Sequence, residues 1–229
     1  MTGVEPKSAM AIMAHPDDAD FTCAGTVINW VSKGWRITYV MCTSGDKGTN
    51  DPGVTPEEIA AIREREAQAA ARELGVADCL FLRHKDGELE VTMEFRRELA
   101  GLLRQHRPDI VLTHDPWRHY QIHPDHRAVG FSVIDAVAAA RDRLYFVEQV
   151  TAGLAPHRVK ELYLWAPEVP NAWIDITDTF ERKVIALKQH KSQVSGIENL
   201  EDRLRQWAEA SAEGHGMKLA EAFRRLELT

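Results

Sequence analysis

Two short motifs combine histidine and aspartate at spacings that suit a metal ion. One is His15-Pro16-Asp17-Asp18, and the other is His123-Pro124-Asp125-His126. A catalytic zinc ion takes three nitrogen or oxygen ligands from the protein and leaves its fourth position for water. His15 and Asp18 can converge on one ion around a turn, and the second motif would supply the third ligand. An acidic residue beside the ion could then deprotonate a water molecule.

Each motif alone is ambiguous, because Asp and Pro are frequent in turns and Asp is a favoured helix N-cap residue. The elements around the motifs favour the metal site. Apolar runs and helix-start signals predict strands at 8–13, 36–42, 79–83 and 109–113, alternating with helices at 20–33, 55–74, 92–106 and 125–141. This alternation implies an α/β fold with a parallel sheet and helices on both faces. Both motifs follow strands of that sheet, at the carboxyl ends where such folds bind ligands.

The rest of the chain adds strands and a helical C-terminus. Strands are expected at 161–165 and 172–176, and helices at 179–189, 200–212 and 217–228. We find no repeat, low-complexity tract or linker that would require two domains. The expectation is one domain over residues 1–229, with a core at about 8–193 and a C-terminal helical extension at about 194–229.

The motifs and their separation resemble the LmbE-like, or PIG-L, N-acetylglucosaminyl deacetylase family. The resemblance rests on Ala14-His15-Pro16-Asp17-Asp18, on Cys23-Ala24-Gly25-Thr26 and on the segment HPDHRAVG that begins at His123. Three weaker similarities extend it to residues 9–193: Arg63-x-x-Glu66 before Leu74-Gly75-Val76, Asp175-Ile176-Thr177, and Ala186-Leu187-x-x-His190-x-Ser192-Gln193.

The resemblance implies a Rossmann-like fold and one zinc ion, although His and Asp ligands accept other divalent metals as well. By similarity, His15, Asp18 and His126 would hold the ion, and Asp17 would be the general base. His123 would be the positively charged partner that stabilises the oxyanion, and Asp125 would keep His123 protonated.

Three further residues are expected to bind substrate. Arg63 resembles an arginine that contacts sugar hydroxyls, although it could instead pair with Glu66 on an exposed helix face. Tyr120 lies near a position where relatives carry a tyrosine, and His190 lies in a family-like segment, where its alternative is a helix C-terminal cap. The sequence departs from the family where Asp20 replaces a usual Glu, and Thr22 a usual Gly.

These features predict a hydrolase that removes an N-acetyl group from a glucosamine-containing small molecule and releases acetate. The alternatives are an amidase that cleaves a larger amide of a sugar or thiol-sugar conjugate, and a non-catalytic metal- or sugar-binding protein. The Asp17 base, which a binding module does not need, favours an enzyme.

Composition narrows the partners and the compartment. The net charge of −7 argues against nucleic acid and anionic membranes as partners. No apolar run could span a bilayer, and residues 1–10 lack the apolar core of a signal peptide, so we expect a cytoplasmic location. The three dispersed cysteines fit buried residues better than a disulfide framework.

A nucleotide cofactor is not expected, because neither GxGxxG nor GxxxxGK[ST] occurs. Short relatives are often oligomeric, so an assembly of several copies of the chain is allowed.

Overall fold

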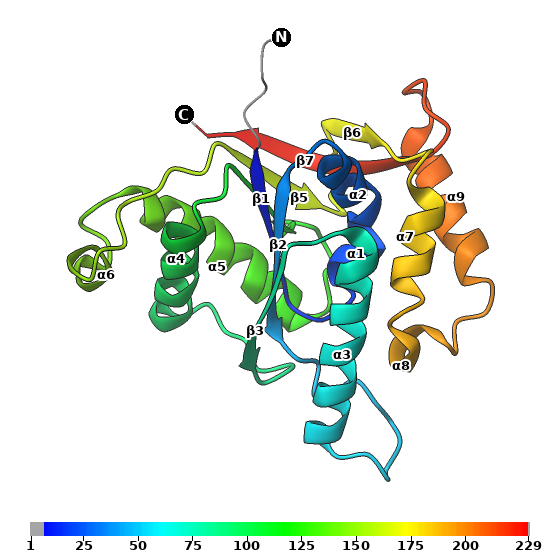
Figure 1. Ribbon diagram of the computed structural model, residues 1–229, viewed down its shortest axis with the longest axis horizontal. Helices are drawn as coiled ribbons and strands as arrows, with labels where there is room; N and C mark the ends of the chain where they lie inside the picture. Colours follow the sequence, from blue (N-terminus) through cyan, green and yellow to red (C-terminus); the bar gives the residue numbers. More distant parts are fainter. Residues whose placement is uncertain (1–6, 229) are drawn as a thin grey trace.

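The computed structural model describes residues 7–228, which form a seven-stranded sheet flanked by helices (Figure 1). The strand order is β3-β2-β1-β4-β5-β7-β6. The parallel strands are β1 (Ser8–Met13), β2 (Arg36–Thr43), β3 (Asp78–His84), β4 (Ile110–His114) and β5 (Glu161–Trp165). The strand β7 (Ala220–Glu227) runs antiparallel between β5 and β6 (Ala172–Asp175). The predicted α/β fold with a mostly parallel sheet is confirmed.

Side chains of β1 alternate between the two faces of the sheet, and each face has its own core. Ala9, Ala11 and Met13 belong to one apolar cluster, whereas Met10 and Ile12 belong to the other. Helices α1 (Asp18–Thr22), α2 (Ala24–Ser32), α3 (Pro56–Leu74) and α7 (Phe180–Leu187) cover the first face, and α4 (Met93–His106) and α5 (Pro124–Arg141) cover the second (Figure 1). A third cluster joins α7 to α9 (Leu200–Ala212).

The helix α3 shows why local sequence specifies some elements well. The Thr55 hydroxyl accepts a hydrogen bond from the Glu58 backbone N–H, and the Glu58 carboxylate accepts one from the Thr55 N–H. This reciprocal capping box fixes the start of the helix. Gly75 ends it with a φ of 79°, in the left-handed region where glycine has no steric penalty.

Four parts of the chain differ from the expectation. The predicted helix at 217–228 is wrong, because Ala220–Glu227 is the strand β7. The predicted helix at 20–33 is two helices, α1 and α2, separated at Cys23. The short helices α6 (Val147–Thr151) and α8 (Lys191–Val194) were not expected. Helix α9 occurs where a helix was predicted.

The strand order reverses direction at β1, whose neighbours are β2 and β4. Loops leaving the carboxyl ends of β1 and β4 therefore diverge and leave a crevice, which is the usual ligand position in such sheets. Within residues 7–228, no helix combines the length and apolar character needed to cross a membrane. The expectation about a signal peptide concerns residues 1–10, and residues 1–6 lie outside the described part.

Candidate active site

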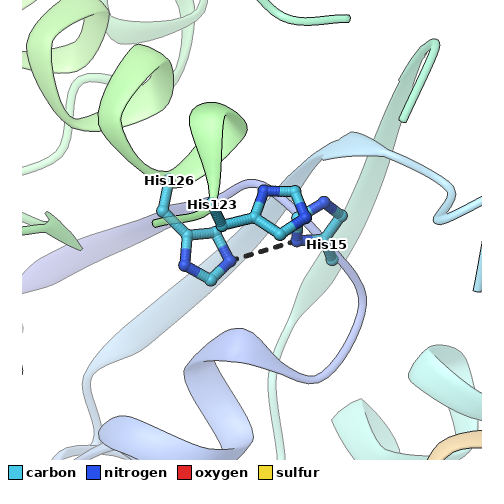
Figure 2. A group of neighbouring side chains, drawn as sticks. All are labelled: His15, His123 and His126. Carbon is cyan, nitrogen blue, oxygen red and sulfur yellow. Dashed lines mark hydrogen bonds between the residues drawn. The ribbon is translucent and has the colours of Figure 1, made fainter. Parts of the chain in front are cut away.

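Both His/Asp motifs meet at this crevice. The first motif directly follows β1, and the second forms the start of α5 just beyond β4. His123 is the N-cap residue of α5 and Pro124 occupies its first turn, so His126 lies one turn further along. Figure 2 shows the rings of His123 and His126 projecting from this turn toward His15, and His126 contacts His15.

Atoms of three side chains converge closely enough to share one ion. The Nδ1 atom of His15 lies 3.2 Å from Nε2 of His126 and 3.4 Å from Oδ2 of Asp18. The Nε2 atom of His126 lies 3.1 Å from Oδ1 of Asp18. Tetrahedral zinc with bonds of 2.0–2.1 Å has ligand atoms separated by about 3.3 Å, so this donor set fits such an ion. These residues also belong to overlapping His/Asp groups that could hold a metal.

The remaining nitrogen of His15 faces two carboxylates. Its Nε2 atom lies 3.1 Å from Oδ1 of Asp86 and 3.3 Å from Oδ2 of Asp125. Burial by itself would lower the pKa of His15, but hydrogen bonds with Asp125, Asp18 and Asp86 outweigh it and raise that pKa to about 12. The surrounding carboxylates that stabilise a proton on His15 would also stabilise a metal cation bound to its ring. Carboxylates behind a ligating histidine are typical of metal sites.

The adjacent carboxylates of Asp17 and Asp18 experience opposite environments. Burial raises the pKa of Asp17 to about 6, although the charge of Arg63 opposes this effect. Burial also disfavours the charged form of Asp18, but His126 and His114 bring its pKa well below the usual value. Divergent pKa values in neighbouring acids are typical of a base placed beside an ionised group. Asp17 also has a φ of 103°, and backbone strain of this kind concentrates at functional sites.

Arg63 is held inward beside Asp17. Its guanidinium donates hydrogen bonds to Oδ2 of Asp17 at 3.3 Å, to the Pro16 carbonyl at 3.0 Å and to the Gly45 carbonyl at 3.2 Å. The alternative pairing with Glu66 is not formed, because that carboxylate accepts hydrogen bonds from Ser192. A Cβ atom on Gly45 would collide with the guanidinium, so the glycine-rich loop leaves room for Arg63.

A cavity of about 360 Å³ opens on this side of the cluster, and we call it the base cavity. Its lining includes His15, Asp17, Arg63, Asp86 and His123. It therefore brings the expected base, the expected sugar-binding arginine and two of the motif histidines to one space.

The Asp125 carboxylate does not contact the His123 ring as expected. It accepts hydrogen bonds from the backbone N–H groups of Gly87 and Leu89, and it faces His15. The Asp125 backbone N–H instead donates to Nδ1 of His123 at 3.3 Å. Burial lowers the pKa of His123, and His15 and His126 lower it further. The geometry therefore favours a neutral His123 with its proton on Nε2.

The other two residues predicted to bind substrate, His190 and Tyr120, do not line the base cavity. His190 is fully buried, and its Nε2 atom lies 2.6 Å from Oδ2 of Asp20, so the expectation that it lines the substrate is wrong. Asp20, the departure from the usual Glu, thus partners a core histidine. Tyr120 is 95% exposed on the loop after β4 and lines neither the base cavity nor the His/Asp cluster.

Sequence reasoning missed two residues of the cluster, Asp86 and His114. Asp86 follows β3, and His114 is the last residue of β4. His114 is buried and stacks on His126 with ring centroids 4.2 Å apart. The position that indicated the two motifs could also have indicated Asp86 and His114, because both residues lie at the carboxyl ends of parallel strands.

Comparison with known proteins identifies one family of deacetylases. Residues 10–137 match the family model described as PIG-L, GlcNAc-PI de-N-acetylase. The chain is 37% identical to a diacetylchitobiose deacetylase of Thermococcus kodakarensis over 187 residues, which cover 82% of this chain and 70% of that protein. It is 30% identical to a probable N-acetyl-alpha-D-glucosaminyl L-malate deacetylase of Bacillus anthracis over 192 residues, covering 82% and 81% of the two chains.

Among solved structures, the fold matches an N,N'-diacetylchitobiose deacetylase from Pyrococcus horikoshii with a TM-score of 0.93 and 35% identity. That match covers 97% of this chain and 85% of the other. The residues matched by the family model, 10–137, contain both His/Asp motifs, most of β1, all of β4 and the start of α5. On these matches, the chain belongs to the PIG-L family of GlcNAc-PI de-N-acetylases.

Proposed function

We propose that this protein is a zinc-dependent N-deacetylase that removes the acetyl group from a glucosamine-containing small molecule. The observation that carries the proposal is the convergence of His15 Nδ1, His126 Nε2 and the Asp18 carboxylate within 3.1–3.4 Å. The Asp17 carboxylate, which is not one of the proposed ligands, lines the cavity beside them. The two curated relatives named above support the substrate class, because both names specify deacetylation of an N-acetylglucosamine compound.

In this proposal, His15, Asp18 and His126 hold the ion, and the other polar residues perform the proton transfers and the binding. When bound, zinc supplies a Lewis acid that polarises the amide carbonyl and makes water more acidic. Asp17 accepts a proton from the attacking water, because its raised pKa of about 6 places it near the range in which a general base works best. It then returns this proton to the amine nitrogen as the C–N bond breaks, so that acetate and the free amine are released. Asp18 stays ionised, because His126 and His114 hold its pKa well below the usual value.

His123 and Arg63 complete the base cavity. The Nε2–H of a neutral His123 donates a hydrogen bond to the oxyanion that forms as water adds to the carbonyl. Arg63 positions Asp17 through its hydrogen bond at 3.3 Å and presents its guanidinium edge to the sugar hydroxyls. Asp125 acts through His15, whose ring it orients from behind.

Acetate release from N,N'-diacetylchitobiose tests the activity directly. The zinc-loaded protein should release acetate, removal of the metal by a chelator should abolish release, and added zinc should restore it. Asp17→Asn should lower kcat by about 10²–10⁴-fold while the protein still binds one equivalent of zinc, because only the base is lost. An Asp17→Asn variant with normal turnover would exclude Asp17 as the base.

Two alternatives predict other outcomes of the same assay. Turnover of bulky sugar amides without turnover of N-acetyl compounds would favour an amidase. Zinc and sugar binding without turnover of either class would favour a binding protein.

A further inference from the structure

A short turn after β2 lies against the end of the Arg63 side chain. This turn consists of residues 45–48, and we call it the Arg63 clasp. A Cβ atom on Gly45 or on Gly48 would collide with the guanidinium, so the backbone of the clasp directly borders it. The Gly45 carbonyl oxygen accepts hydrogen bonds from Arg63 at 3.2 Å and from the Gly48 N–H at 3.0 Å. Because one oxygen both closes the turn and holds the arginine, a displacement of the clasp also displaces Arg63.

The position of Arg63 determines how the Asp17 base is held. The guanidinium donates to Oδ2 of Asp17 and to the Pro16 carbonyl, both in the first motif. Its Nε atom is buried, and within residues 7–228 it has no hydrogen-bond partner. The clasp and the first motif are therefore the two sets of contacts that orient this side chain.

The first end of the clasp is anchored by Thr43, the last residue of β2. The buried Thr43 hydroxyl donates to the Ala14 carbonyl at 2.9 Å and accepts the Gly45 N–H at 3.2 Å. Ala14 immediately precedes the metal-ligand candidate His15. The Thr43 N–H also donates to the Ala14 carbonyl, so loss of the hydroxyl would free the clasp without breaking the strand pairing.

The second end is anchored by Gln193 on α8, which lies 145 residues away in the chain. Its side-chain amide donates to the Gly48 carbonyl at 3.0 Å. The start of α8 is itself fixed to α3, because the N–H and hydroxyl of Ser192 both donate to the Glu66 carboxylate. Glu66 and Arg63 are three residues apart on α3, so they lie on the same side of that helix.

The middle of the clasp is tied to Asp86. The Lys47 N–H donates to the Asp86 carboxylate at 3.3 Å, and the Asp86 N–H donates to the Asp46 carboxylate at 2.9 Å. Asp86 lines the base cavity, whereas Thr43 and Gln193 do not. The two end anchors can therefore influence the reaction only through the backbone that they hold.

We propose that Thr43 and Gln193 are positioning residues of the deacetylation, which anchor the two ends of the Arg63 clasp and thereby hold Arg63 against the Asp17 base. The inference rests on the proposed function, because it assigns that pair to the reaction. We expect Thr43→Val and Gln193→Met, called the anchor variants, each to lower kcat/KM for N,N'-diacetylchitobiose about tenfold, since small displacements of catalytic groups are costly. Their affinity for zinc should equal that of the wild type, because the three proposed ligands are retained.

Two matched controls separate this role from a general loss of stability. The buried Thr113 hydroxyl donates to the Ile12 carbonyl at 2.9 Å, and the half-buried Gln189 amide donates to the Ile185 carbonyl at 3.4 Å. Neither of these bonds involves the clasp. Thr113→Val and Gln189→Met should keep the wild-type kcat/KM, and thermal melting checks that all four variants are folded. Tenfold losses in the controls as well would overturn the proposal.

Arg63→Lys provides the background for a double-mutant cycle. If the anchors act through the guanidinium, the anchor substitutions should lower kcat/KM by less than about twofold in a protein that already lacks it, because mutations that act on one group are not additive. Tenfold losses in both backgrounds would show that Thr43 and Gln193 act through another part of the site and would overturn the proposal.

A measurement without substrate separates the anchors from the proposed function. Nitrogen-15 NMR follows the exchange of the Arg63 Nε–H with solvent, and its signal is the one that Arg63→Lys lacks. Exchange should be faster in both anchor variants of the zinc-loaded protein than in the wild type or the controls. Equal exchange in all of them would overturn the proposal. Faster exchange in the anchor variants of a protein that releases no acetate would reject the deacetylase function and retain the anchors of Arg63.

Discussion

The Nε2 atom of His114 lies 3.3 Å from Oδ2 of Asp18, and both side chains are largely buried. On the other side of the ring, the indole N–H of Trp165 donates to Nδ1 of His114 at 3.1 Å. Because an indole N–H can only donate, Nδ1 must accept and the proton of His114 must reside on Nε2. The Ala14 backbone N–H is also directed at Nε2, at 3.3 Å, and the Asp18 oxygen is the acceptor for the Nε2 proton.

His114 should therefore contribute to metal binding without contacting the ion. We expect His114→Ala to weaken zinc binding by about 10–100-fold, the usual effect of losing a residue that orients a metal ligand. His114→Gln should recover part of the affinity, because its side-chain amide can place an N–H near the position of Nε2–H. Competition with a chromophoric chelator measures the affinity without any assay of turnover.

His215→Ala is the control for the His114 variants. His215 is exposed and stacks on Trp173, away from the His/Asp cluster. It should bind zinc as tightly as the wild type. If His114→Ala also bound zinc with wild-type affinity, the contact with Asp18 would have no role in positioning this ligand.

The sequence was sufficient to bring the two His/Asp motifs together, because the signals that locate them are local. His15 and Asp18 follow a buried strand, and His123 and His126 flank a proline at a helix start, so the parallel-sheet rule was enough to bring them together. The same rule applies to Asp86 and His114, but neither lies in a dense motif. Their roles depend on which side chains face them across the sheet edge, and this information is not local.

The strand β7 was mistaken for a helix because its residues favour helices. Ala220–Glu227 is rich in Ala, Glu, Arg and Leu, which have high helix propensity. Pairing with β5 and β6 overrides that preference, and Glu221 ties the strand to Lys183 and to the start of α2. Such long-range contacts decide the structure but cannot be inferred from residues within the segment.

Gly45 should be essential for the position of Arg63. Its φ of 66° lies in the left-handed region, and a Cβ atom there would meet the Arg63 guanidinium. We expect Gly45→Ala to lower kcat/KM for acetate release by about 10²-fold, because a small displacement of Arg63 also displaces the Asp17 base. The left-handed backbone should cost a further ~1 kcal/mol of stability. Steady-state kinetics and urea unfolding measure the two effects.

Gly196→Ala provides a matched control for Gly45→Ala. No heavy atom lies within 4 Å of the Cβ that would be added at Gly196, and its φ lies outside the left-handed range. Kinetics and stability of this variant should stay close to those of the wild type. Equal activities of the two alanine variants would show that Arg63 does not depend on the space at Gly45.

The buried pair of His190 and Asp20 should make stability depend on pH. Burial by itself would lower the pKa of His190, but its hydrogen bond with Asp20 and the charge of that carboxylate raise the pKa overall. A group whose pKa is raised on folding stabilises the folded state fully below its unfolded pKa, which is about 6.5 for histidine. That contribution is lost as the pH rises through the folded pKa.

We therefore expect His190→Gln to destabilise the protein by about 1–3 kcal/mol at pH 5.5 and by less at pH 9. Urea unfolding of the metal-free wild type and variant at each pH gives both differences, and metal binding then does not contribute. His215→Gln should lie within about 0.5 kcal/mol of the wild type at both pH values, because His215 is exposed. A loss for His190→Gln that is equal at pH 5.5 and pH 9 would mean that packing, and not the charge of His190 beside Asp20, carries the stabilisation.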